Sequence, residues 1–189
     1  MRIQESAENY LETFSCILEN MECGMTEAQL NDSITHNFIV QMIPHHQAAI
    51  EMSENILKYT TNIPLQDIAE CIIEEQTRSI ENMEEILCSC GDVQNCEQQV
   101  CMYQERMNQI MQNMFCRMGN VQAVNNINAN FIREMIPHHL GAVEMSELTL
   151  CYDIDPQLVP ILESIIASQK RGIMQMQRLL RMIGSGRMC

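Results

Sequence analysis

Two runs of identical sequence, Met-Ile-Pro-His-His, contain the residues best suited to chemistry. In each run a methionine lies three residues before the first histidine, and another follows seven residues after it. Thioether and neutral imidazole are soft donors, and together they favour copper(I), with silver(I) as a mimic. The candidate ligands are Met42, His45, His46, Met52, Met135, His138, His139 and Met145.

On a helical wheel, the histidines of the first run point inward. At about 100° per residue, His45 and His46 lie on either side of Met42. Glu51 and Glu54 face the opposite way. A single inward histidine is usually a core residue satisfied by one hydrogen bond. Two adjacent histidines need partners for four ring nitrogens, and a metal ion would satisfy two of these at once.

Harder metals fit this pattern less well. Zinc would require cysteine, histidine or carboxylate ligands in a closed tetrahedron, and we expect the helix carboxylates to face outward. A di-iron site would require glutamate three residues before an inward histidine. Methionine and isoleucine occupy those positions in both runs. The donor set therefore predicts copper(I) rather than zinc or iron.

Four residues downstream are weaker candidates for the same site. Gln76 and Gln169 interrupt apolar stripes, either as inter-helix hydrogen-bond partners or as groups that hold a ligand histidine from behind. Met83 and Met176 lie two turns further on and could reach the same space. Core filling explains these two methionines equally well.

The two runs belong to a longer internal repeat. Sliding the sequence against itself by 93 residues aligns it without gaps over nearly its whole length. Tyr10 then falls on Tyr103, and Glu-Met-Ser-Glu at 51–54 falls on the same four residues at 144–147. We interpret the chain as a tandem duplication that forms one domain from two copies, about 1–95 and 96–189.

Each copy is expected to form three helices, since no alternating pattern predicts a strand. In the first copy, apolar residues spaced by three and four predict helices around 11–21, 38–58 and 65–87. Gly24 and the polar stretch 31–33 separate the first two, with Asp32, Ser33 or Thr35 as the N-cap. The apolar stripe continues past Pro44, so we expect a continuous helix that is kinked there.

Composition excludes several classes of partner and activity. The formal net charge is −14, from 25 acidic and 11 basic residues, so we expect no nucleic-acid binding and no anionic membrane surface as partner. No apolar run is long enough to span a membrane. No phosphate loop, nucleotide fingerprint or nucleophile–base pair is present in the sequence, which argues against an enzyme.

The ten cysteines leave two roles open. Thiolates would add strong copper(I) ligands, whereas the alternative is a scatter of small apolar side chains, or disulfides in an exported protein. Cys88, Cys90, Cys96 and Cys101 cluster after the third helix. The start of the chain has no signal-peptide pattern, which favours the cytosol, although a processed periplasmic or extracellular form would look the same.

The Met-Ile-Pro-His-His runs continue as Ala-Ile-Glu-Met at 49–52 and Ala-Val-Glu-Met at 142–145. This pattern resembles the ferritin-like domain-of-unknown-function family numbered 305, which includes copper-binding proteins of the CopM type. The likeness covers about residues 36–88 and 129–181, with the downstream glutamines and methionines. The resemblance implies an all-α, ferritin-like helical bundle with paired helices from the two halves around its centre. It also implies that the eight methionines and histidines are copper ligands.

We therefore predict a copper(I)-binding protein that sequesters, stores or delivers the ion without turnover. Its partners would be the metal ion, a copper donor or acceptor protein, or further copies of the chain as a homo-oligomer. The alternative is a non-catalytic, methionine-rich interaction protein in which the histidines are structural. Metal content separates the two, because an interaction protein should be indifferent to copper.

Overall fold

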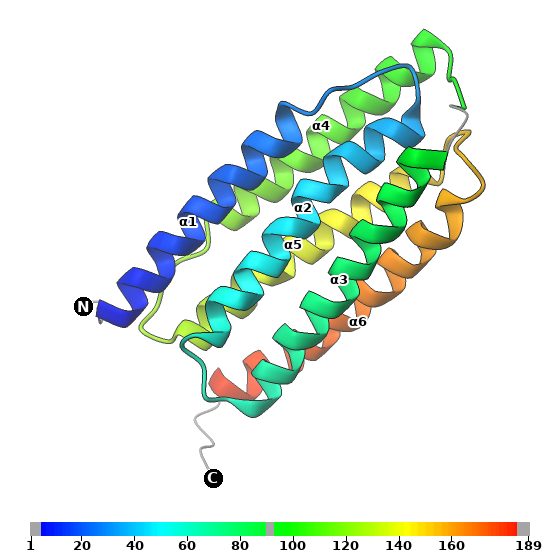
Figure 1. Cartoon of the computed structure of the whole chain (residues 1–189). Helices are drawn as coiled ribbons and strands as arrows, with labels where there is room; N and C mark the ends of the chain where they lie inside the picture. Colours follow the sequence, from blue (N-terminus) through cyan, green and yellow to red (C-terminus); the bar gives the residue numbers. More distant parts are fainter. Residues whose placement is uncertain (1–4, 90–92, 185–189) are drawn as a thin grey trace.

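The computed structural model describes residues 5–89 and 93–184, and within these ranges the chain forms six α-helices and no strand. The helices lie side by side in a bundle (Figure 1). This confirms the predicted all-α class and the three helices expected in each half. The helices are α1 (Glu5–Thr26), α2 (Ile34–Leu57), α3 (Ile63–Ser89), α4 (Glu97–Gly119), α5 (Ile127–Thr149) and α6 (Leu158–Gly184).

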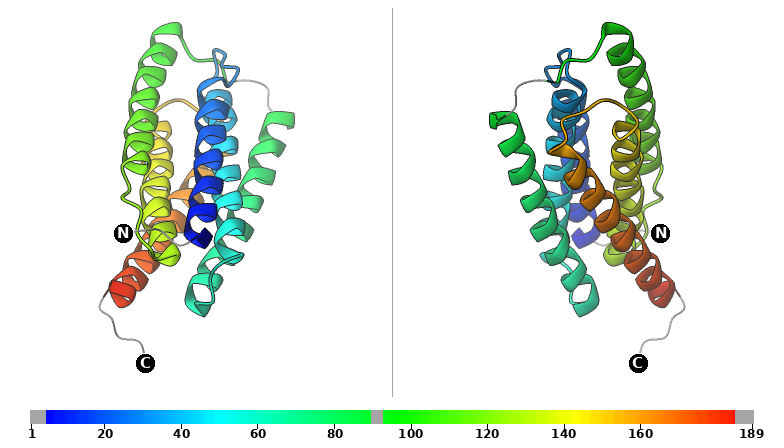
Figure 2. Two further views of the ribbon diagram at one scale, coloured as in Figure 1. Left: turned by 90° about the vertical axis from the view of Figure 1, so that its left-hand side faces the viewer. Right: turned by 90° about the vertical axis from the view of Figure 1, so that its right-hand side faces the viewer.

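α2 and α5 form the centre of the bundle and run in opposite directions (Figure 1). α1 packs on α2, and α4 packs on α5. α3 and α6 pack on the two central helices and against each other, and they lie in front in the right-hand view of Figure 2. None of the described helices has the length and hydropathy needed to cross a membrane.

The two central helices are buried along most of their length. In α2 the side chains of Phe38, Ile39 and Ile56 are fully buried, and Phe131 and Ile132 occupy the corresponding turns of α5. Each such side chain contributes roughly 1.5–3 kcal/mol through burial of apolar surface. Any polar side chain on these helices that points inward is therefore removed from water, as the histidines are.

The start of α2 differs from the prediction by about one turn. The helix begins at Ile34 because Ser33, one of the three predicted caps, accepts a hydrogen bond from the backbone N–H of His36 through its side chain. Periodicity alone placed the start near Phe38, since the polar first turn carries no apolar stripe. The helix then continues without interruption through Pro44, as predicted.

Gly24 does not separate α1 from α2, because α1 continues to Thr26. The glycine instead makes room for the proline of the neighbouring helix. A Cβ atom added at Gly24 would lie 2.9 Å from Cβ of Pro44. The polar stretch that follows α1 is the actual separator.

Methionine also fills the core away from the histidines. Four of the five buried residues of α4 are methionines, and Met114 packs so closely on α5 that a Cβ atom at Gly141 would meet its side chain. An unbranched thioether fits such an irregular gap well. Burial of a methionine in this bundle is therefore not by itself a sign of a metal ligand. The four are Met107, Met111, Met114 and Met118.

Candidate metal centre

Four histidines meet at the centre of the bundle, where α2 and α5 face each other. His45 and His46 come from α2, His138 and His139 come from α5, and none is more than 2% exposed. The rings of His45 and His138 stack with their centroids 3.7 Å apart and an interplanar angle of 32°. The neighbouring rings within each pair are 5.9 and 6.0 Å apart. The fold thus brings both Met-Ile-Pro-His-His runs to one place.

The histidine rings make few hydrogen bonds. Nε2 of His138 lies 3.1 Å from the backbone oxygen of His45, and Nε2 of His46 lies 3.1 Å from Oγ of Ser79 on α3. Because a carbonyl only accepts, Nε2 of His138 carries the proton and its Nδ1 presents a lone pair. Five buried ring nitrogens have no partner in the described structure. These are Nδ1 and Nε2 of His45 and Nδ1 of His46, His138 and His139.

Unpartnered buried nitrogens are costly. Each buried polar atom left without a hydrogen bond costs about 1–3 kcal/mol of folding free energy, and such atoms are few in native proteins. Five within one four-residue cluster are therefore an unusual concentration. A site of this kind calls for a ligand or a second arrangement of the rings that would satisfy these atoms.

All four rings are held in the neutral form. Burial lowers the pKa of His46 to about 3 and that of His138 to about 4, because the imidazolium ion loses its hydration in the core. The pKa values of His45 and His139 are also lowered, first by burial and then by the neighbouring histidines. Neutral imidazole is the form that binds metal ions, so these rings need not release a proton first.

The predicted methionine ligands all lie in the same apolar core as the histidines. None of the six is more than 1% exposed. Met83 lies one turn beyond Ser79 on α3, and Ser79 contacts His46. Their burial would allow these thioethers to reach the histidine rings. Methionines that only fill the core are buried in the same way. The six are Met42, Met52, Met83, Met135, Met145 and Met176.

The histidines do not form a closed metal cage in this arrangement. Within the described residues, no three histidine, cysteine or acidic side chains converge on one point as metal ligands would. The rings of His45 and His138 contact each other with an interplanar angle of 32°, and neither ring shares an acidic or cysteine ligand with the other among the described residues. A site assembled from these residues would need thioether donors and a rotation of at least one ring.

The predicted role of the two glutamines does not match the observed hydrogen bonds. Gln76 and Gln169 are buried, but both amide atoms of Gln76 and Oε1 of Gln169 have no partner. The side chain that holds His46 is Ser79, three residues after Gln76 on the same face of α3. Ser79 is not among the predicted site residues, although a spacing of three residues places it beside Gln76 on one face of the helix.

One helix carboxylate faces inward, against the prediction. Glu134 on α5 is 3% exposed and accepts a 2.7 Å hydrogen bond from the Tyr10 hydroxyl of α1. Burial raises the pKa of Glu134 to about 7, although the Tyr10 hydrogen bond opposes the shift. Glutamine occupies the position 93 residues earlier, Gln41, which is buried too. A carboxylate is expected to face water, so an inward Glu134 is not expected until its partner Tyr10 is known.

The cysteines lie outside the histidine cluster, although Cys71 lines a small pocket that His139 also lines. The eight within the described residues are all exposed and carry free thiols. The predicted cluster after the third helix includes Cys90, which lies outside the described residues, as does Cys189. The role of the thiols in metal binding stays a prediction. The eight are Cys16, Cys23, Cys71, Cys88, Cys96, Cys101, Cys116 and Cys151.

Three comparisons relate the chain to known proteins. The model of the family described as domain of unknown function DUF305 matches residues 35–180, which run from the first turn of α2 into α6. A solved structure, the crystal structure of a DUF305 fragment from Deinococcus radiodurans, superposes with a TM-score of 0.58 at 22% sequence identity. The match covers 81% of this chain and 97% of that fragment. No curated protein matches the sequence.

Proposed function

This protein belongs to the DUF305 family, and we propose that it binds copper(I) at the centre of the bundle through the buried histidines and methionines. The observation that carries the proposal is the set of five buried ring nitrogens without partners. All five belong to neutral imidazoles surrounded by an apolar core that contains many thioethers. Such donors suit a soft monovalent cation better than zinc, calcium or magnesium.

The residues proposed to hold the ion come from both central helices. His45 and His46 with Met42 would act on the α2 side, and His138 and His139 with Met135 on the α5 side. Met52 and Met145 lie two turns along the same faces, with Met83 and Met176 as further thioethers. Because none of these groups titrates near neutral pH, binding would be governed by ring orientation rather than by proton release.

The proposed role is to sequester, store or deliver copper(I) without turnover. Among the described residues, Glu134 is the buried carboxylate of the two central helices, and it is bonded to Tyr10 rather than to a histidine. A copper donor or acceptor protein, or a second copy of the chain, remains a predicted partner. The cytosolic location also remains a prediction.

A competition titration tests this proposal. The reduced, metal-free protein is titrated anaerobically with copper(I) against a chromogenic chelator, beside a variant with all four cluster histidines changed to alanine. We expect the affinity of the variant to fall by more than about a hundredfold, because first-sphere donors are lost. A Met42→Leu, Met135→Leu double variant conserves side-chain volume and should weaken binding without unfolding the core.

The chain offers its own matched controls. His36→Ala removes the one remaining histidine, which contacts the backbone oxygen of Gln29 away from the cluster. Met102→Leu and Met174→Leu alter methionines that are at least half exposed. These three variants should bind as the wild type does. Absent binding, or binding unchanged in the four-histidine variant, would contradict the proposal and favour an interaction protein with structural histidines or copper bound by thiols alone.

A further inference from the structure

Two openings lie along the seam between α3 and α6, and each contains one histidine of the cluster. The larger, which we call the His46 groove, has a volume of about 450 Å³ and is lined by His46, Ser79, Asn82, Ile161 and Ser164 among others. The smaller, the His139 pocket, has a volume of about 50 Å³ and includes His139, Gly172, Gln175, Ile68 and Cys71.

These two sets of lining residues are related position by position. Adding 93 to His46 and Ser79 gives His139 and Gly172. Subtracting 93 from Ile161 and Ser164 gives Ile68 and Cys71 in the same way. The openings are therefore counterparts, yet one has about nine times the volume of the other. The difference must come from residues that changed between the two positions.

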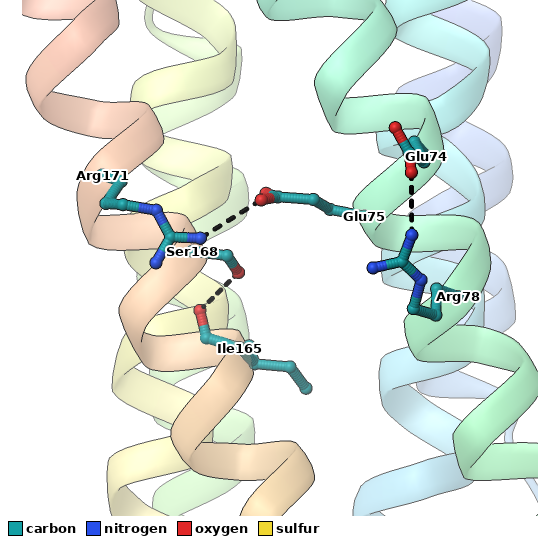
Figure 3. A network of polar contacts seen from close by, with 6 residues as sticks. All are labelled: Glu74, Glu75, Arg78, Ile165, Ser168 and Arg171. Carbon is teal, nitrogen blue, oxygen red and sulfur yellow. Dashed lines mark hydrogen bonds and ion pairs between the residues drawn. The ribbon is translucent and has the colours of Figure 1, made fainter.

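An ion pair that joins α3 and α6 distinguishes the surroundings of the two openings. Arg171 on α6 pairs with Glu75 on α3 at 3.2 Å and so bridges the seam (Figure 3). The counterparts of these residues are Arg78 and Ser168, and serine supplies no carboxylate. Arg78 instead pairs with Glu74 of its own helix at 2.7 Å. The bridge lies between the two openings, because Glu75 and Arg171 line both, and Arg78 makes no equivalent bridge to Ser168 across the His46 groove.

The side chain of Ser168 lies on the seam but bonds within its own helix. Its hydroxyl donates a 3.1 Å hydrogen bond to the backbone oxygen of Ile165, within α6 (Figure 3). No side chain therefore reaches across to Arg78 from this position among the contacts of the described residues. No ion pair between Arg78 and α6 therefore crosses the His46 groove within the described residues.

The open groove ends on polar groups that lack partners. Gln76 and Gln169 line it, are at most 3% exposed, and have unpartnered amide oxygens. Ser79, which contacts His46, also lines it. A cation that sheds water on its way to the cluster would meet these oxygens before the imidazole.

We propose that copper(I) reaches the histidine cluster through the His46 groove, while the Arg171–Glu75 pair closes the counterpart route to His139. This inference rests on the proposed function, because it names the path to the same site. It assigns the two glutamines to the path rather than to the support of a ligand histidine. It also predicts that the first histidine met by an entering ion is His46.

Stopped-flow uptake tests the route. Copper(I) is supplied as its bicinchoninate complex, and the loss of the complex's absorbance is followed under anaerobic conditions. Ser164→Trp places a large ring in the His46 groove, and we expect it to slow uptake about tenfold with little change in equilibrium affinity, as a blocked gate would. Cys71→Trp makes the counterpart change in the His139 pocket and should alter the rate less than about twofold relative to Cys71→Ser.

A third variant opens the closed side. Glu75→Gln removes the carboxylate that pairs with Arg171, and uptake should accelerate in this variant, including when it is combined with Ser164→Trp. Circular dichroism and thermal unfolding show whether each variant is folded. If the wild type binds no copper(I), both the proposed function and the route are wrong. If it binds, but Ser164→Trp and Cys71→Trp behave alike, only the route is overturned.

Discussion

The two sides of the histidine cluster have the same residues at their centre and different surroundings. On one side, His46 contacts a serine hydroxyl and faces an open groove. On the other, His139 lies against Gly172, where an added Cβ would be 2.9 Å from its ring, and faces a pocket of only about 50 Å³. The imidazoles are kept identical while access, hydrogen bonding and packing differ. The two sides share the burial of their rings and differ in the size of the opening beside them.

The largest effect we expect is a loss of stability at low pH, which tests the burial that the four histidine rings share. Because the native pKa values of the four histidines lie below the unfolded value near 6.5, the unfolded state binds more protons as the pH falls. The stability that depends on the neutral rings is therefore fully present above about pH 6.5, and His46 and His138 should each lower the free energy of unfolding by roughly 2 kcal/mol by pH 5. Glu134 has the opposite effect, because its raised native pKa increases the free energy of unfolding as the pH falls, by less than the histidines lower it. Urea unfolding at pH 7 and pH 5 measures the net loss.

Single variants show how much each histidine contributes to the loss of stability at low pH. His46→Gln and His139→Gln should each remove about a quarter of the histidine contribution, since both rings are buried alike. His36→Gln, outside the cluster, should remove none. Equal pH dependence in all three variants would show that the cluster is not the source.

The next effect concerns Glu134 and its counterpart Gln41. The native pKa of Glu134 is about 7, above the unfolded value near 4.5, so its contribution to stability is present at low pH and lost as the pH rises through 7. Glu134→Gln should therefore raise the free energy of unfolding by about 2–3 kcal/mol at pH 8, with little change at pH 4.5. Gln41→Glu should do the reverse. Chemical denaturation across this range checks both, and a pH-independent effect would rule out ionisation as the cause.

A smaller effect follows from the glycine beside His139. Gly172→Ala should force the ring to shift and destabilise the fold by about 1–2 kcal/mol relative to Gly119→Ala, whose added methyl meets open space. On the other side, Ser79→Ala removes the hydrogen bond to His46 and should cost about 1 kcal/mol. Thermal unfolding compares the three variants. Equal stability of the two glycine variants would mean that His139 has room to move.

The smallest effect on stability is expected from the ion pair across the seam. The side chains of Arg171 and Glu75 are 57% and 37% exposed, so solvent screens their attraction. Glu75→Gln should change the free energy of unfolding by less than about 0.5 kcal/mol. Its effect on copper(I) uptake should be much larger than its effect on stability. A large loss of stability would instead make the pair a structural element.

Most of the fold and the heart of the candidate site could be predicted from the sequence. Apolar spacing located the three helices of the first half, the 93-residue repeat predicted three more in the second, and the wheel placed His45 and His46 inside the core. A wheel gives the buried face of a helix, but it does not name the residue on the neighbouring helix that meets this face. For that reason Ser79 was missed. The inward Glu134 was missed because a carboxylate is expected in water unless its partner, here Tyr10, is known.

The hydrogen bond from the His138 ring to the His45 backbone links the two sides directly. If a bound ion rotates the ring of His45 or His138, the other ring loses a contact. The free energy needed to rotate that second ring then changes. If the proposed copper(I) binding holds, occupancy of one side would alter the affinity of the other, and the alteration would be reciprocal. A protein of this design would load in a cooperative sequence, and its binding isotherm would depart from that of two independent sites.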